Sequence, residues 1–160
     1  MSVSSDLVDA VVTRIQTVPN VGLVYNRLRW SANTSDYLDL FTSSIGGQVQ
    51  TRAWMARWGG VEDAWDDPSA FGRLGERYVV LVMGIQSFKD STSSSRELHD
   101  LAELVKDAIN TRKDFDLANV VDYSVKVTVD EPDVRQFGSV LCDVVNIKVA
   151  FDVVRAVTFA

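Results

Sequence analysis

The feature that most constrains this chain is a strand-length segment, residues 76–86, that is apolar at both its odd and its even positions. Successive side chains of a β-strand point to opposite sides of a sheet. One set is Tyr78, Val80 and Val82, and the other is Val79, Leu81, Met83 and Ile85. Burial on both sides predicts a central strand, or a strand whose outer face is covered by a helix or a neighbouring subunit.

Two amphipathic helices are predicted on either side of this strand. The first covers residues 7–15, with Ser4 or Ser5 as its cap and Pro19 as its stop. The second follows a serine run, begins with the capping-box spacing of Ser94 and Glu97, and ends near Arg112. Its apolar stripe is Leu98, Leu101, Ala102, Val105, Ala108 and Ile109.

The remaining periodic segments predict strands and one short helix. We expect strands over residues 21–30, 49–58, 121–129 and 140–154, with a short helical piece over 35–41. The last two strands are expected to form a long hairpin. The fold class predicted is therefore α+β: a mainly antiparallel sheet of about five strands, with two main helices packed on one face, in a single domain spanning residues 1–160.

Composition excludes several classes of protein. The 160 residues suffice for one domain with its own core, and the single Cys142 excludes an intrachain disulfide. With 22 acidic and 16 basic residues the net charge is −6, which argues against a general binder of nucleic acid or anionic membranes. No segment reaches the ~20 apolar residues of a membrane span, and the first residues lack a signal-peptide pattern, so we expect assembly in the cytoplasm.

A long irregular loop is predicted over residues 59–75. This segment contains four acidic residues and four glycines, yet it also carries Trp65 and Phe71. Large aromatic side chains in a polar loop are typical of a protein–protein contact. We therefore predict a protein–protein interface, with another subunit or a partner, formed by Arg57, Trp58, Trp65, Asp66, Asp67 and Phe71. For Trp54, burial in the core of the domain is expected at least as strongly as a place in an interface.

Residues that could carry chemistry are few. His99, among carboxylates on the second helix, is either a general base or, as we favour, a surface histidine. The acidic pairs Glu62-Asp63 and Asp66-Asp67 lack calcium-loop spacing. The glycine pairs at 46–47 and 59–60 lack a phosphate-loop lysine and are expected to form turns. We expect no catalytic residues, no metal and no cofactor.

The arginines of the early strands have two interpretations. Arg27, Arg29, Arg52 and Arg57 suit an interface because a planar guanidinium makes several hydrogen bonds and stacks on aromatic rings. Ordinary surface pairing is the alternative, and we favour it. Cys142 is predicted to be a small core residue.

Taken in order, these segments resemble the tail terminator, or tail-to-head joining, proteins of long-tailed bacteriophages. The resemblance lies in the opening helix that ends at Pro19-Asn20-Val21-Gly22, the strand 24–29, the short helix with Tyr37, Leu38 and Phe41, the Trp54 strand ending in Arg57, the apolar strand opened by Arg77-Tyr78, and the closing hairpin from Phe137 to Phe151. It covers nearly the whole chain, although no piece is a catalytic signature.

The resemblance implies a structural protein of the virion neck, not an enzyme. Members of the family assemble as a six-membered ring on the head-proximal end of the tail tube, stop its polymerisation and join the tail to the head. The implied partners are other copies of the chain, the tail tube protein and a head-side connector, with genome DNA passing only through the lumen. Alternatives are another neck component, a minor tail protein or a small ligand-binding domain with a pocket under the second helix.

Overall fold

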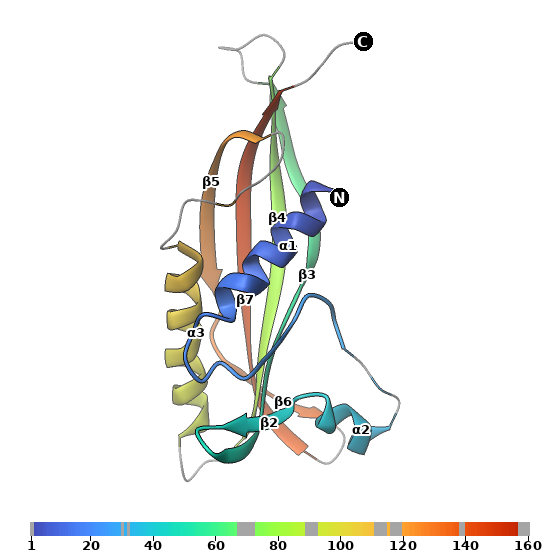
Figure 1. The fold of residues 1–160 in the computed structure, drawn as a ribbon, viewed down its shortest axis with the longest axis vertical. Helices are drawn as coiled ribbons and strands as arrows, with labels where there is room; N and C mark the ends of the chain where they lie inside the picture. The colour runs from blue at the N-terminus through green and yellow to red at the C-terminus, as the bar shows by residue number, and fades with distance from the viewer. Residues whose placement is uncertain are drawn as a thin grey trace.

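A computed structural model describes residues 2–29, 31, 33–66, 73–88, 93–110, 115, 120–137 and 140–156. The elements in chain order are α1 (Val3–Ile15), β1 (Leu23–Tyr25), α2 (Thr34–Asp39), β2 (Thr42–Ile45), β3 (Gln48–Asp66), β4 (Arg73–Ser87), α3 (Ser94–Asn110), β5 (Val120–Val129), β6 (Asp133–Phe137) and β7 (Val140–Ala156). Three long strands, β3, β4 and β7, run the length of an elongated molecule (Figure 1).

The seven strands form one mixed sheet with the order β1-β3-β4-β7-β5, in which β2 also pairs with β3 and β6 with β7. Only the pairing of β1 with β3 is parallel among the pairs described. β4 lies between β3 and β7 and pairs with β7 from Arg73 to Ser87. The prediction that the doubly apolar segment forms a central strand is therefore confirmed.

The predicted fold class was wrong in its sheet. Instead of about five mainly antiparallel strands with two main helices, the described part of the chain has a mixed sheet of seven strands and three helices. The serine-rich β2 has the composition of a turn, and it forms because Gly46 and Gly47 both adopt positive φ, 58° and 81°, which suits a tight two-residue hairpin turn. β6 was not predicted either, because it begins directly after Pro132, in a segment whose composition is typical of a turn.

The predicted irregular loop over residues 59–75 was also wrong in its extent. β3 continues to Asp66 and β4 begins at Arg73, and their ladder persists to the pair Asp66–Leu74. The register shifts between Trp58 and Gly60, and again between Val61 and Ala64. Such bulges absorb extra residues in one strand and increase its twist, so a segment without alternation can still be strand.

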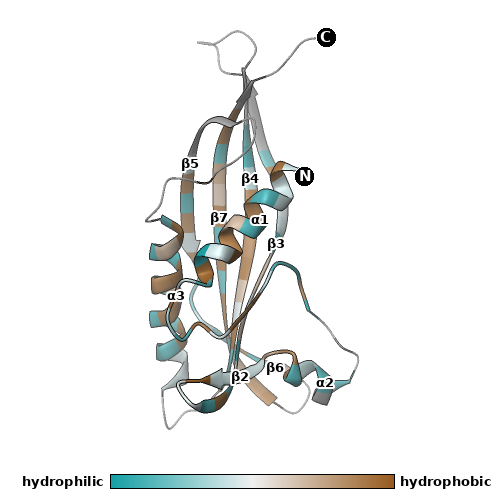
Figure 2. Cartoon of the chain, in the orientation of Figure 1, coloured by the Kyte–Doolittle hydropathy of each residue, from teal (hydrophilic) through white to brown (hydrophobic). Residues whose placement is uncertain are grey.

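α1 and α3 pack on the same face of the sheet and form the main core with it (Figure 1). Their apolar stripes meet the inward residues of β3, β4, β5 and β7, with Trp54, Phe151 and Leu98 fully buried. Bands of opposite hydropathy alternate along both helices (Figure 2), as expected for helices with one buried side. α1 begins earlier than predicted, because Ser2 caps it by accepting a hydrogen bond from the Ser5 amide.

Both ends of α3 are tied to other elements by polar contacts. At its start, the hydroxyls of Ser94 and Ser95 donate to Asp143, a completely buried carboxylate of β7. At its end, the Arg14 guanidinium of α1 donates to the Ile109 carbonyl at 3.1 Å and lies 3.7 Å over the Phe115 ring. A cation near the last carbonyls of a helix is favourable. These contacts fix where the helix layer sits on the sheet.

Among the residues that the structure describes, those that cover the opposite face of the sheet gather at one end. There α2, β1 and β6 contribute to a small second core around Phe41, Met55, Ile85 and Cys142. Beyond this cluster, the described helices leave the face uncovered (Figure 1). We call this part the open face; it carries the odd residues of β4 from Arg77 to Met83, of which Val79 is buried and Met83 borders the second core, and the even residues of β5 and β7 from 126 to 128 and 146 to 152.

Candidate interaction surface

Charged side chains on the open face form ion pairs between strands, one between the neighbours β4 and β7 and one that spans β4 from β7 to β3. Arg77 of β4 stands opposite Asp152 of β7, and its guanidinium donates to the two carboxylate oxygens at 2.6 and 3.1 Å. Lys148 of β7 donates to Glu62 of β3 at 2.5 Å. These side chains are between 34% and 44% exposed. Because water screens such pairs, each contributes only about 0–1 kcal/mol to stability.

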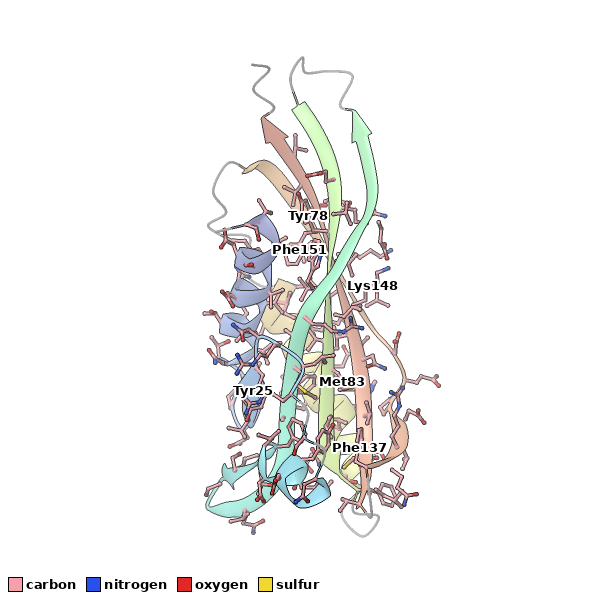
Figure 3. All side chains as sticks on the ribbon, turned by 90° about the vertical axis from the view of Figure 1, so that its right-hand side faces the viewer. Tyr25, Tyr78, Met83, Phe137, Lys148 and Phe151 are labelled. Carbon is pink, nitrogen blue, oxygen red and sulfur yellow. The ribbon has the colours of Figure 1, made fainter. Side chains whose placement is uncertain are left out.

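Figure 3 shows the division between the two faces of the sheet. Lys148 points away from α1, whereas Tyr78 and Phe151 point to the helix side. The strand pairing explains this arrangement, because neighbours in sequence alternate between faces and Tyr78 is paired with Phe151. The two ion pairs, Arg77–Asp152 and Glu62–Lys148, which we call the charged ladder, therefore lie on the side that α1 and α3 do not cover.

Beside the ladder lies an apolar hollow of about 640 Å³. Its apolar lining residues are Leu28, Met55, Leu81, Val82, Met83 and Ile147, and its polar ones are Arg57, Thr128, Asp130, Arg135, Asn146 and Lys148. Leu28 is 52% exposed, and Leu81 and Met83 are half-buried. The volume falls within the roughly 300–1,000 Å³ of ordinary binding pockets. We refer to this site as the apolar hollow.

Cations outnumber carboxylates around these two features. Among the described residues of the face, Arg57 and Lys126 are exposed and form no ion pair with a described carboxylate. Arg135, on the rim of the hollow, pairs with Asp133 at 3.3 Å. The chain as a whole has a net charge of −6. This face is therefore a local basic region with an apolar centre, which suits an acidic, partly apolar binding partner.

Of the predicted interface residues, the two whose side chains the structure describes, Arg57 and Trp58, lie on opposite faces of the sheet. Arg57 lies on the rim of the apolar hollow, but its neighbour Trp58 lies on the helix side, where its ring packs 5.5 Å from that of Tyr78. Trp58 is 36% exposed and lines a separate hollow of about 490 Å³ beside α1, with Ser4, Ser5, Val8, Asp9 and Asn26. Trp65 and Asp66 end β3, and their side chains lie outside the described residues, as do Asp67 and Phe71 entirely.

The predicted core residues are confirmed. Trp54 shares a face with Trp58, is fully buried, and donates its indole N–H to the Val21 carbonyl at 3.1 Å. Cys142 is buried in the second core. Burial first, and then the adjacent Asp143 carboxylate, raise the pKa of the Cys142 thiol to about 11. The thiol is therefore protonated at neutral pH and is a poor nucleophile.

The residues considered for chemistry are dispersed. His99 is exposed on α3, Glu62 is engaged by Lys148, and Gly46-Gly47 forms the β2–β3 turn. Arg52 is buried, donating to the Asn20 carbonyl at 2.9 Å and to Glu97 at 2.5 Å. Within the described ranges, no group of three or more His, Cys, Asp or Glu side chains is placed to hold a metal ion.

The open face was the part of the site that sequence reasoning missed. Leu81 and Met83 were assigned to a buried strand, and Lys126 and Thr128 only to a wet strand face. The alternation of β5 did signal one exposed side. What was lacking was the register that sets Thr128 opposite Lys148, and Lys148 opposite Leu81, on one surface.

The comparisons with known proteins give little. No family model matches the chain, and no curated protein matches it. Among solved structures, the chain is similar to the sheath/tube terminator of an extracellular contractile injection system (PVC, extended state), at 12% identity and a TM-score of 0.37, over 97% of this chain. It spans 60% of that protein's chain. A likeness at this level carries no argument here. No helix in the described residues is long and apolar enough to cross a membrane.

Proposed function

We propose that this protein is a structural component of a phage tail: a tail terminator that forms a ring on the head-proximal end of the tail tube, stops its polymerisation and joins the tail to the head. The observation that carries the proposal is the open face, a basic surface with an apolar hollow that the described part of the chain leaves uncovered. Such a surface suits assembly with other protein chains.

The sequence supports the same proposal by its resemblance to the tail terminator family along nearly the whole chain. On this proposal the protein acts by binding and not by catalysis. Its partners are further copies of itself in a ring of six, the tail tube protein and a head-side connector, and genome DNA passes through the lumen. The protein is assembled in the host cytoplasm and resides in the virion neck.

The test is tail length, measured by negative-stain microscopy in particles produced without this gene. We expect overlong, headless tubes of variable length, because nothing would stop the polymerisation of the tube. Tails of uniform length beside separate filled heads would instead assign the protein to head docking, as another neck component. Normal infectious particles would contradict a role in virion assembly, and a search for ligands of the apolar hollow would follow.

A further inference from the structure

The end of the β3–β4 hairpin has the chemistry that the apolar hollow lacks. We call residues 63–72 the hairpin tip; its sequence holds Asp63, Asp66 and Asp67 around Trp65, followed by Phe71. The hollow offers an apolar lining and the exposed cation Arg57, which pairs with no described carboxylate. We propose that the hairpin tip of one copy of this protein docks in the apolar hollow of a second copy.

The paired end of the hairpin, at Trp65 and Asp66, lies far along the strands from the hollow of the same chain, whereas Glu62, further back on β3, is bound by Lys148 at the rim. Trp65 is paired with Gly75 and Asp66 with Leu74, so both strands remain hydrogen-bonded to this end of the hairpin. Leu81 and Met83, which line the hollow, lie six to eight residues further along β4 than Gly75. At ~3.3 Å per residue this is roughly 20–26 Å along a paired strand. A contact of Trp65 with the hollow is therefore made between copies.

Charge favours this occupant over a neutral peptide. Arg57 and Lys126 on the open face form no ion pair with a carboxylate that the structure describes, while Asp63, Asp66 and Asp67 bring three carboxylates close together in sequence. Asp130 is the carboxylate in the described lining of the hollow, and the lining cations Lys148 and Arg135 are paired with Glu62 and Asp133, which leaves Arg57 as the cation of the lining without a described carboxylate partner. A segment with acidic residues on both sides of an indole ring satisfies the apolar centre and the basic rim together.

The two halves of this contact are different surfaces of the chain. Each copy would use its tip toward one neighbour and its hollow toward another, which makes the interface heterologous. Such contacts build rings when the rotation closes and filaments when it does not. The closed ring rests on the proposed function, whereas the docking of tip in hollow does not.

The test is disulfide cross-linking between a tip cysteine and a cysteine at the rim of the hollow. Ser69→Cys and Thr128→Cys change neither the charges nor the apolar side chains of the two surfaces, and the native Cys142 is buried. Under mild oxidation, the double variant should give a ladder of covalent oligomers, both as purified protein and in assembled particles. The matched control combines Ser69→Cys with Asp100→Cys on the outer side of α3 and should give at least tenfold less product.

A charge exchange separates docking from chance collision. Arg57→Glu in the Thr128→Cys chain should reduce the cross-link to Ser69→Cys chains at least tenfold, and Asp66→Arg in the partner chain should restore it. Cross-linking equal to the Asp100→Cys control, no effect of Arg57→Glu, reaction of the tip with another virion protein, or no product in either setting would overturn the proposal. Overlong tails without the gene, together with no tip–hollow product, would remove docking and leave termination standing.

Discussion

Cys142 provides a residue-scale test of burial, because its thiol is 1% exposed and its pKa is raised to about 11. In the folded protein, a thiol-reactive chromophore at pH 8 should label this cysteine at least a hundredfold more slowly than in urea, since only the thiolate reacts. Labelling as fast as in the unfolded chain would contradict the packing of the second core.

The same thiol predicts how stability depends on alkaline pH. Its folded pKa lies above the unfolded value, so the folded state binds more protons between about pH 9 and pH 11. The stabilisation from the neutral thiol is complete below that range and is lost as the pH rises through it. Urea unfolding at pH 8 and pH 10.5 should show a larger loss for the wild type than for Cys142→Ala. An equal loss in both would show that Cys142 is not the group responsible.

Gly84 tests the contact between β4 and the Trp54 ring. A Cβ at position 84 would lie 2.7–2.9 Å from three ring carbons of Trp54, which is closer than real contacts. Gly84→Ala should therefore lower the free energy of unfolding by about 1–3 kcal/mol, the usual effect of overpacking. Urea denaturation measures the change. Added to Trp54→Phe, the same substitution should cost less, because the smaller ring leaves room; strict additivity would contradict this account.

For single residues, the alternation of apolar and polar positions along the strands predicted which side chains are in the core better than it predicted which lie on the surface. The burial of Trp54 follows from its place in an apolar strand, and the sequence alone suffices to predict it. The separation of Arg57 from Trp58 also follows from alternation, yet grouping them by sequence proximity hid it. Whether an apolar residue such as Leu81 is covered could not be predicted, because it depends on which elements lie over the sheet.

The placement of α3 depends on a contact at each of its ends. Asp143→Ala removes the acceptor of the Ser94 and Ser95 hydroxyls, and Arg14→Ala removes the donor to the Ile109 carbonyl. Each should destabilise the fold by about 2–4 kcal/mol, because buried polar partners are left without hydrogen bonds. Equilibrium urea unfolding, followed by circular dichroism, gives the values.

The matched control on the same helix is Asp100→Ala, an exposed position that should change stability by no more than about 0.5 kcal/mol. Arg14→Lys keeps the charge but loses the planar fork over the Phe115 ring, so its effect should lie between the wild type and alanine. If Arg14→Ala proves as mild as Asp100→Ala, the two helices are held by their apolar stripes alone.

Elements with a strong period were predicted, and elements formed by pairing were not. The two long helices and the central strand were anticipated because their apolar residues recur at 3.6 or 2 positions. β2 and β6 have four and five residues and polar compositions, and they exist because β3 and β7 extend past the main core and accept them as edge partners. The extension of β3 to Asp66 passes through two bulges, which interrupt the alternation that would have predicted it.

On the scale of the whole molecule, the two faces of the sheet have different roles. The helix layer buries one face and supplies the main core. The open face contributes little to stability, because its ion pairs are partly exposed. Substitutions on the open face should therefore affect assembly much more than folding, which allows the two to be measured separately.

The unlike halves of the proposed contact give the final prediction. A tip variant, Trp65→Ala with Phe71→Ala, retains the hollow, and a hollow variant, Leu81→Glu, retains the tip. In sedimentation velocity the wild type should form assemblies larger than a dimer, and each variant alone should be a monomer. Mixed in equal amounts, the variants should stop at twice the monomer mass, since their one competent pair leaves two defective surfaces. A self-complementary interface predicts no such rescue, so a monomeric mixture beside an assembled wild type, or a wild type that stays monomeric, would count against docking.

Circular dichroism of both variants should match the wild type, because Leu81 lies on the open face and the tip lies at the far end of the hairpin from the second core.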